Sequence, residues 1–196
     1  MNRRTRVVLL CGIGLLIGFI ARQALGHPLT MSTRAMVPSV WPGDVVWVTE
    51  SEPELGDVVQ VRLSDDLGLY RMVAAGGQTV EMRKGRLLID GKKSDDGTAI
   101  TIEAPGKGCT AKATPAVRTA IGEREFRTIP GGEMEVVTVP RDHVFLLGDH
   151  RGVAGDSRPW GTLPKDKVEG VARLIIWSWD SCLGRLRWRR MANSID

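Results

Sequence analysis

The sequence predicts a mostly β fold: a barrel-like or sandwich-like body with a small inserted lobe, preceded by one apolar helix at the N-terminus. Two observations support this prediction. Several short segments alternate apolar and polar residues with a period of two, as strands do. Glycine and proline punctuate the chain between them, and no long helical period follows the N-terminal apolar run. The 196 residues, 42% hydrophobic and 26% charged, suit one folded domain of medium size.

Individual strands are expected where the alternation is clearest. In "DVVWVTE" at 44–50, Val46 and Val48 share one face, whereas Val45 and Trp47 share the other. The segment "RLLIDGKK" at 86–93 is typical of a strand that enters a tight Asp-Gly turn. Residues 92–135 are more polar and rich in Gly and Thr, which predicts a variable insertion. Further strands are expected at 56–63, 135–140, 143–149 and 168–179.

The N-terminal region contains an uninterrupted apolar run, Val7 to Ala21, behind three arginines. This run is short for a membrane span, which needs about 20 residues, but Arg22 and Gln23 could snorkel and extend it toward Leu25. A cleaved signal peptide, with Ala24-Leu25-Gly26 as its cleavage site, is the alternative. We expect an uncleaved anchor: a basic cytoplasmic tail at 1–6, a transmembrane helix at 7–25 and a β domain at 30–196 on the outer side.

Positive charge is concentrated at the two ends of the chain. The formal net charge is +4, and subtracting seven terminal arginines leaves −3 for the rest. These arginines are Arg3, Arg4, Arg6, Arg185, Arg187, Arg189 and Arg190. A mildly acidic body argues against a nucleic-acid partner. Basic ends suit contact with anionic membrane lipid.

Cysteine and histidine do not predict a metal site. Cys11 lies in the apolar run, whereas Cys109 and Cys182 could pair in an oxidising compartment, a question that the sequence leaves open. The three histidines are scattered and show no metal-ligand spacing. We therefore expect neither a metal nor a cofactor.

Three blocks carry a resemblance to a known family. They are "AMVPSVWPGDVVWV" at 35–48, "YRMVAAGGQTVEMRKGRLLIDGKK" at 70–93 and "LLGDHRGVAGDSRPWGTLPKDKVEGVARLIIWS" at 146–178. In this order they are similar to the S-M-x-P-T…G-D, K-R-V-x-G-x-P-G-D and G-D-N-R…S-x-D-S-R-x-W-G-x-V-P motifs of bacterial type I signal peptidases. The sequence thus resembles these membrane-anchored serine–lysine proteases, also called leader peptidases, which remove signal peptides from exported proteins. The resemblance implies a signal-peptidase-like β fold.

The resemblance also implies where the catalytic groups should lie, and three of them are missing. The position of the nucleophilic serine is Ala35, directly before Met36. The lysine that acts as the base falls on Tyr70, and the serine that orients this lysine falls on Ala154. A hydroxyl that helps to hold the oxyanion falls on Thr33, which could still donate a hydrogen bond.

Most other signature residues are retained, and we expect them to have structural roles. Asp156 and Arg158 could form a buried or half-buried ion pair. The family's Asn is His150 here, and its Pro-Gly-Asp is Gly76-Gly77-Gln78. The retained residues are Met36, Pro38, Gly43, Asp44, Arg71, Gly148, Asp149, Arg151, Asp156, Ser157, Arg158, Trp160 and Gly161.

These departures predict a catalytically inactive homologue at the bacterial inner membrane. Such a protein could still bind signal peptides or exported preproteins by strand addition, or pair with an active signal peptidase. An alternative is an active endopeptidase with a relocated nucleophile, Thr33, served by His150. Another is a purely structural membrane-associated partner. Tyr70 could act as a base only with a strongly lowered pKa, so we expect its ring to fill the space of the lysine.

The tryptophans are expected in two settings. Trp41 and Trp47 lie in the first block, where the family rests on the membrane, although core packing is equally open for Trp47. Trp160 is expected in the core. Trp177, Trp179 and Trp188 lie close to "RLRWRR", which is either an interfacial tail or a solvated one.

Overall fold

The computed structural model describes residues 26–63, 66–105 and 111–195. The predicted cytoplasmic tail and anchor, residues 1–25, lie outside this range. Within the described range, no helix combines the length and apolar character needed to cross a membrane. Cys182 forms a disulfide bond, and both Cys11 and Cys109 lie outside the described residues.

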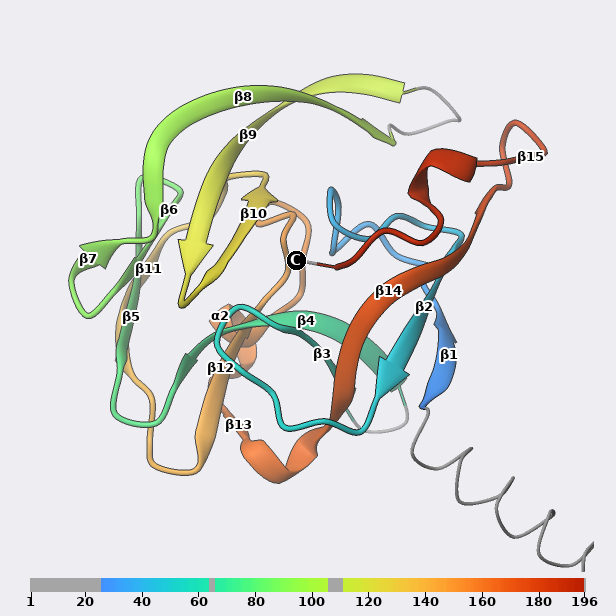
Figure 1. Cartoon of the computed structure of the whole chain (residues 1–196). Helices are drawn as coiled ribbons and strands as arrows, with labels where there is room; N and C mark the ends of the chain where they lie inside the picture. The colour runs from blue at the N-terminus through green and yellow to red at the C-terminus, as the bar shows by residue number, and fades with distance from the viewer. Residues whose placement is uncertain (1–25, 64–65, 106–110, 196) are drawn as a thin grey trace, which may run out of the picture.

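The main sheet has eight antiparallel strands in the order β1-β2-β14-β3-β4-β12-β13, with β15 paired to β14 (Figure 1). The strand β14 pairs with both β2 and β3, so it joins the N-terminal strands to the rest of the sheet. The strands are β1 (His27–Thr30), β2 (Asp44–Thr49), β3 (Val58–Leu63), β4 (Asp66–Ala75), β12 (His143–Leu147), β13 (Leu163–Pro164), β14 (Val168–Asp180) and β15 (Arg185–Leu186). Short helical turns are α2 (Ser157–Trp160), η1 (Lys165–Lys167) and η2 (Trp188–Arg190).

The alternation predicted for β2 is confirmed. Val46 and Val48 are fully buried, whereas Val45 and Trp47 on the other face are partly exposed. Val46 and Val48 pack in one core cluster with Met36 and Ile175, which come from the first and third blocks of the sequence. The mostly β fold class is therefore as predicted.

A second sheet has the order β11-β5-β6-β7. Its strands are β5 (Thr79–Arg83), β6 (Arg86–Ile89), β7 (Lys92–Lys93) and β11 (Met134–Thr138). The Asp-Gly turn predicted after β6 is confirmed. Asp90 and Gly91 both have positive φ, +50° and +72°, which matches the tight two-residue hairpin turn.

A third sheet, β10-β9-β8, lies inside the segment 92–135. It consists of β8 (Asp95–Pro105), β9 (Ala111–Ile121) and β10 (Arg124–Thr128). In Figure 1, the paired strands β8 and β9 form a long two-stranded ribbon that arches over the body. Phe126 and Ile121 pack into a core cluster with Val73 and Phe145 of the main sheet, so this lobe is fastened to the body.

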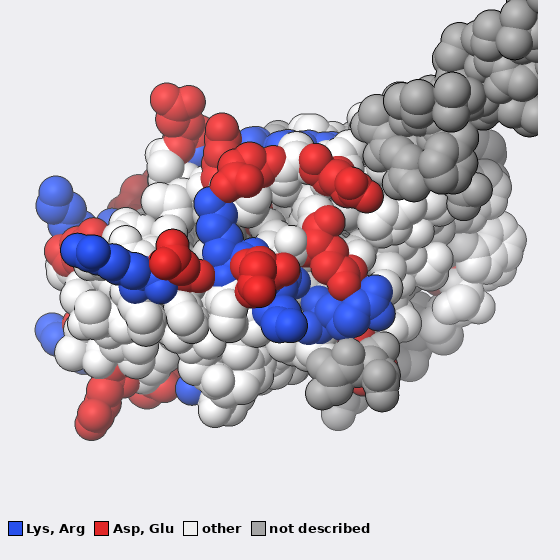
Figure 2. All heavy atoms as spheres, turned by 90° about the horizontal axis from the view of Figure 1, so that it is seen from below, with Lys and Arg blue, Asp and Glu red and all other residues white. Residues whose placement is uncertain are grey.

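The lower face of the molecule in Figure 1, where β13 and η1 lie, carries mixed charge. Figure 2 shows acidic and basic side chains next to one another on this face. Arg62 and Glu169 form an ion pair of 2.6 Å, and Lys165 pairs with Glu52.

Candidate active site

A cleft of about 340 Å³ lies between the segment that follows β1 and the first half of β4. Ala35 and Tyr70, two of the positions implied by the resemblance, both line it, and so does Thr33. The remaining lining residues are Leu29, Thr30, Met31, Ser32, Leu63, Asp66, Leu67, Gly68 and Leu69. The cleft thus contains the position of the nucleophile and the position of the base.

The third implied position, Ala154, contacts the same region through Gly148. A methyl group on Gly148 would lie 2.3 Å from the Ala154 Cβ and 2.7 Å from the Ala35 carbonyl oxygen, so only glycine fits there. The amide of His150 also donates to the Ala35 carbonyl at 2.9 Å. The structure therefore brings Ala35, Tyr70 and Ala154 together, although they are far apart in sequence.

The Tyr70 ring occupies one wall of the cleft. It packs edge-on against Trp160, with 5.9 Å between ring centroids and 80° between planes, and the absence of a side chain on Gly68 makes room for it. Burial raises the pKa of Tyr70 above its usual value of 10.0, and the nearby carboxylates of Asp156 and Asp66 raise it further. The phenol is consequently protonated at neutral pH and cannot serve as a base.

Thr33 and His150 are not joined by a hydrogen bond in the structure. The segment from Thr33 to Ser39 is a series of turns, and the Thr33 hydroxyl accepts a long hydrogen bond of 3.5 Å from the Ala35 amide. His150 is not among the described residues that line the cleft. Burial lowers the pKa of His150, and the positive charge of Arg34 lowers it further, so the imidazole is neutral at pH 7.

Below the cleft, Arg71 and Asp149 form a fully buried bidentate ion pair. The Nε and Nη2 atoms of Arg71 donate to the two carboxylate oxygens of Asp149 at 2.8 Å each. Arg71 also donates to the Gly56 carbonyl at 2.6 Å, and its guanidinium lies 3.7 Å above the Phe126 ring. The Ser39 hydroxyl donates to Asp149 and accepts from Arg71. This network links β4, β12 and the turn that carries Ala35.

The Asp-Ser-Arg part of the third block fastens α2 to β12. Asp156 is fully buried, accepts from the Gly148 amide at 3.0 Å and pairs with Arg158 at 2.7 Å, which confirms the expected ion pair. The Ser157 hydroxyl accepts from the amide of Leu146 at 3.0 Å. Trp160, expected in the core, is partly buried and packs against the cluster that contains Val59 and Met72.

Arg151 is also buried, but its setting differs from that of Arg158. Both terminal nitrogens of its guanidinium lack a hydrogen-bond partner. Burial lowers the pKa of Arg151 to about 10, although Asp149 and Asp156 partly oppose this shift. At neutral pH the side chain stays positively charged.

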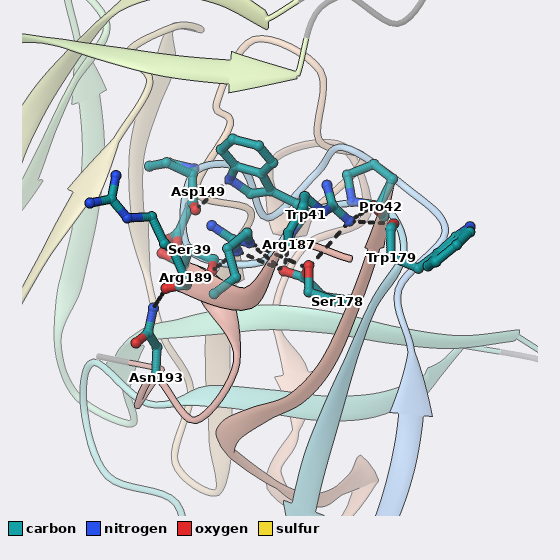
Figure 3. Close-up of polar contacts among 12 residues, drawn as sticks. Ser39, Trp41, Pro42, Asp149, Ser178, Trp179, Arg187, Arg189 and Asn193 are labelled. Atoms are coloured by element: carbon teal, nitrogen blue, oxygen red, sulfur yellow. Dashed lines mark hydrogen bonds and ion pairs between the residues drawn. The ribbon is translucent and has the colours of Figure 1, made fainter. Parts of the chain in front are cut away.

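Asp44 is the centre of a second network, which holds the other end of the first block (Figure 3). Its buried carboxylate accepts from the Trp41 amide at 2.8 Å, from the Ser178 hydroxyl at 2.6 Å and from Arg190 at 2.6 Å. Arg187 donates to the carbonyls of Pro42 and Trp179, at 2.6 and 2.7 Å. The turn between Met36 and Asp44 is thus tied to the C-terminal segment.

The same turn contains the other residues retained from the first block. Met36 is fully buried, and the Val37–Pro38 peptide bond is cis. The Gly43 amide donates to the Met31 carbonyl at 2.8 Å, and the Gly43 carbonyl accepts from the Trp179 amide at 2.9 Å. These residues shape the turn, and none of them is among the described residues that line the cleft. Met36, expected at the cleft beside Thr33 and Ala35, packs instead into the core cluster of β2.

The expectation that "RLRWRR" is an interfacial or a solvated tail is wrong for two of its arginines. Arg187 and Arg190 bind Asp44, and Arg190 lies 4.4 Å from the Trp41 ring centroid. Arg185, Trp188 and Arg189 are exposed. Sequence reasoning missed Ser178, whose only signal was that it lies within the third block. Ser39 fills the position of a family threonine and was expected only as part of the turn, without its hydrogen bonds to Asp149 and Arg71.

Comparison with known proteins decides the family. The model of the family "Signal peptidase, peptidase S26" matches residues 4–177. The chain belongs to this family. The resemblance inferred from the three blocks is therefore confirmed.

The chain is also similar to proteins of a plant and of bacteria. Thylakoidal processing peptidase 1 of Arabidopsis thaliana is 26% identical over an alignment of 180 positions, gaps included, which covers 82% of this chain and 45% of the relative. Signal peptidase I of Aquifex aeolicus is 26% identical over an alignment of 217 positions, gaps included, which covers 89% of this chain and 84% of the relative. This chain spans less than half the length of the two Arabidopsis relatives. A solved signal peptidase I from Enterococcus faecalis is 22% identical, with a TM-score of 0.39, and the match covers 63% of this chain and 98% of that one.

Proposed function

We propose that this S26 family member is catalytically inactive and uses its cleft to bind signal peptides or exported preproteins. One observation carries the proposal: two of the three family positions, Ala35 and Tyr70, line one cleft, the third, Ala154, lies beside it across Gly148, and none of them supplies a nucleophile or a base. Ala35 has no heteroatom that could attack a carbonyl. Tyr70 has a raised pKa, and Ala154 could not orient a lysine even if one were present. Catalytic groups of this kind act as a unit. We therefore expect the loss of all three to abolish the activity and not only to lower it.

The backbone around the cleft favours binding of an extended peptide. β1 is an edge strand of the main sheet, because it pairs only with β2 among the described strands. β4 pairs with β12 from Arg71 to Ala75, so its first half, Asp66–Tyr70, pairs with β3 on one side only. A peptide between β1 and this half of β4 would gain main-chain hydrogen bonds by strand addition. Such binding needs none of the lost catalytic side chains.

A cleavage assay tests the loss of activity. The full-length chain in detergent is given a preprotein beside the triple variant Ala35→Ser/Tyr70→Lys/Ala154→Ser. We expect no product from the wild type and measurable product from the triple variant. If the wild type cuts and Thr33→Ala abolishes the cutting, a relocated nucleophile is at work and the proposal is wrong.

A binding assay separates peptide capture from a purely structural role. We expect a synthetic signal peptide to raise the melting temperature of the full-length chain. Leu67→Glu, a change of an exposed cleft residue, should abolish this rise, whereas Leu183→Glu, a matched change outside the cleft, should not. Absence of any peptide effect on the wild type would favour the structural role.

The proposed location is the bacterial inner membrane, with residues 7–25 as the anchor and the β domain on the outer face. An active signal peptidase is a further candidate partner. Carbonate extraction of membranes tests the anchor, because an integral protein stays in the pellet. Removal of residues 1–25 should release the β domain to the supernatant if the anchor alone retains it.

A further inference from the structure

A second hollow, larger than the cleft, is lined by residues from the ends of β8 and β9, from β15 and from η2. Figure 1 shows the ends of β8 and β9 on the side of the molecule where β15 lies. Its volume is about 930 Å³, within the range of pockets that hold small molecules. Among the described lining residues, Ser32 alone is common to this hollow and the cleft. We call it the arginine pocket, because five arginines line it: Arg34, Arg185, Arg187, Arg189 and Arg190.

The arginine pocket carries an excess of positive charge. Two carboxylates, Glu103 and Asp180, are among its described lining residues. Arg187 and Arg190 share one further carboxylate, that of Asp44. Counting these three acids against the five arginines leaves a net charge of +2. An anionic ligand would reduce the repulsion among the arginines.

Several guanidinium donors in the pocket are not used by the protein. Within the described part of the chain, Arg34, Arg185 and Arg189 form no ion pair. The Nε atoms of Arg34 and Arg187 are buried and have no hydrogen-bond partner. Planar guanidinium groups bind phosphate and carboxylate oxygens through two parallel hydrogen bonds. The exposed guanidinium groups of Arg185 and Arg189 therefore offer donors to a ligand as well as charge.

The rim of the pocket is apolar and exposed. Trp41 and Trp188 line the pocket, and Trp188 is 69% exposed. Leu183, also a lining residue, is 53% exposed. Trp177 and Trp179 lie two residues apart on β14, just before the lining segment, and their exposed side chains share one face of the strand. Exposed apolar side chains beside arginines favour a ligand that has both an anionic group and an apolar part.

We propose that the arginine pocket binds the phosphate group of an anionic amphiphile, such as the headgroup of an acidic phospholipid, with the acyl chains against the tryptophan rim. The lower face of the molecule is the contrast, because its acidic and basic side chains lie next to one another (Figure 2). An acidic peptide would satisfy the arginines but would leave the exposed apolar rim without a partner. The inference does not depend on peptide binding in the cleft.

The test is calorimetric titration of the full-length chain in an uncharged detergent. The probes are dihexanoyl phosphatidic acid, dihexanoyl phosphatidylcholine, inorganic phosphate and an acidic peptide. We expect phosphatidic acid to bind most tightly, because it alone combines an unshielded phosphate with apolar chains.

Paired variants assign the binding to the pocket. Arg185→Gln/Arg189→Gln removes two exposed arginines of the lining that have no ion pair. Arg118→Gln/Arg127→Gln removes two exposed arginines of the β9–β10 hairpin and changes the net charge equally. At about five-fold to six-fold per arginine, the variant that lacks two pocket arginines should bind phosphatidic acid about 30-fold more weakly. The hairpin variant should bind like the wild type.

Four results would overturn the proposal. Equal affinity for phosphatidic acid and phosphatidylcholine would exclude recognition of the anionic group. Equal affinity for inorganic phosphate and phosphatidic acid would reduce the pocket to a site for free anions. Tighter binding of the acidic peptide would make the partner a protein. An equal loss in both double variants would mean that net charge alone drives binding.

Discussion

The cleft and the network beneath it contain residues of the same family motifs, but the two regions differ in what their side chains do. Ala35 lines the cleft, makes no side-chain hydrogen bond and is only partly buried. Arg71 and Asp149, one layer below, are fully buried and bonded to each other. A change in the cleft alters chemistry with little effect on folding. A change in the network leaves a charged side chain buried without its ion-pair partner. This difference explains how a chain can lose catalytic groups and keep the rest of the motif.

The largest expected effect is at the buried pair. Asp149→Ala should lower the free energy of unfolding by about 3–5 kcal/mol, because the Arg71 guanidinium would remain buried without its carboxylate. Urea denaturation of the full-length chain in detergent measures this loss. Ala35→Ser is the matched change in the cleft and should stay within about 0.5 kcal/mol of the wild type. Equal losses in the two variants would contradict the division between cleft and network.

A smaller effect is expected where the C-terminal segment is tied to the first block. Arg190→Gln removes the closest ion-pair partner of Asp44, which is fully buried, while Arg187 stays within 3.5 Å. We expect a loss of about 2 kcal/mol, since one charged partner remains. Arg189→Gln, its neighbour in sequence, is the control and should change stability by less than about 0.5 kcal/mol. Thermal unfolding of both variants checks the order. A loss in Arg189→Gln as large as that in Arg190→Gln would mean that Asp44 does not anchor the segment.

The effect at Tyr70 should be smaller again and should depend on the residue introduced. Tyr70→Phe keeps the ring against Trp160, and we expect a change within about 0.5 kcal/mol. Tyr70→Lys loses the aromatic contact, worth about 0.5–1.5 kcal/mol, and places an ammonium group in a partly buried site. Urea denaturation should therefore show Lys to be less stable than Phe. Equal stability of the two variants would mean that the ring does not support the cleft wall.

The sequence predicted the fold best where one face of a strand is buried and the other is not. In β2 this contrast is sharp, so the period of two is visible. In β8, residues 96–99 are exposed on both faces, and the alternation of Ile100, Ile102 and Ala104 with exposed residues is short and lies in a polar segment, so the sequence did not predict this strand. Polar composition alone indicated an insertion.

The candidate site shows the same limit in another form. The loss of the catalytic groups could be predicted from the sequence, because each family motif has one residue type at its catalytic position and this chain has another. The ion-pair partners of Asp44 could not be predicted, because Arg190 is 146 residues away in sequence. A run of arginines has the same sequence pattern whether it is solvated or folded back onto the domain. Long-range ion pairs depend on the tertiary arrangement and leave no local pattern.

The smallest expected effect is a pH dependence at His150, which stands where the family has Asn. Burial and Arg34 lower the pKa of His150 in the folded chain below its usual value of 6.5. The unfolded chain therefore binds a proton at this position more readily than the folded chain does. The resulting stability is present above pH 6.5 and is lost as the pH falls through the lowered pKa.

His150→Asn removes this titration and should lose less stability than the wild type between about pH 7 and pH 5. Melting temperatures of both proteins across that range measure the difference, because the carboxylates that protonate near pH 5 are common to both. Arg34→Gln should give an intermediate slope, since it removes one of the two causes of the lowered pKa but leaves the imidazole buried. A wild type and a His150→Asn variant with the same slope would show that the imidazole is freely hydrated, and that the turn around Ala35 is more open than the structure describes.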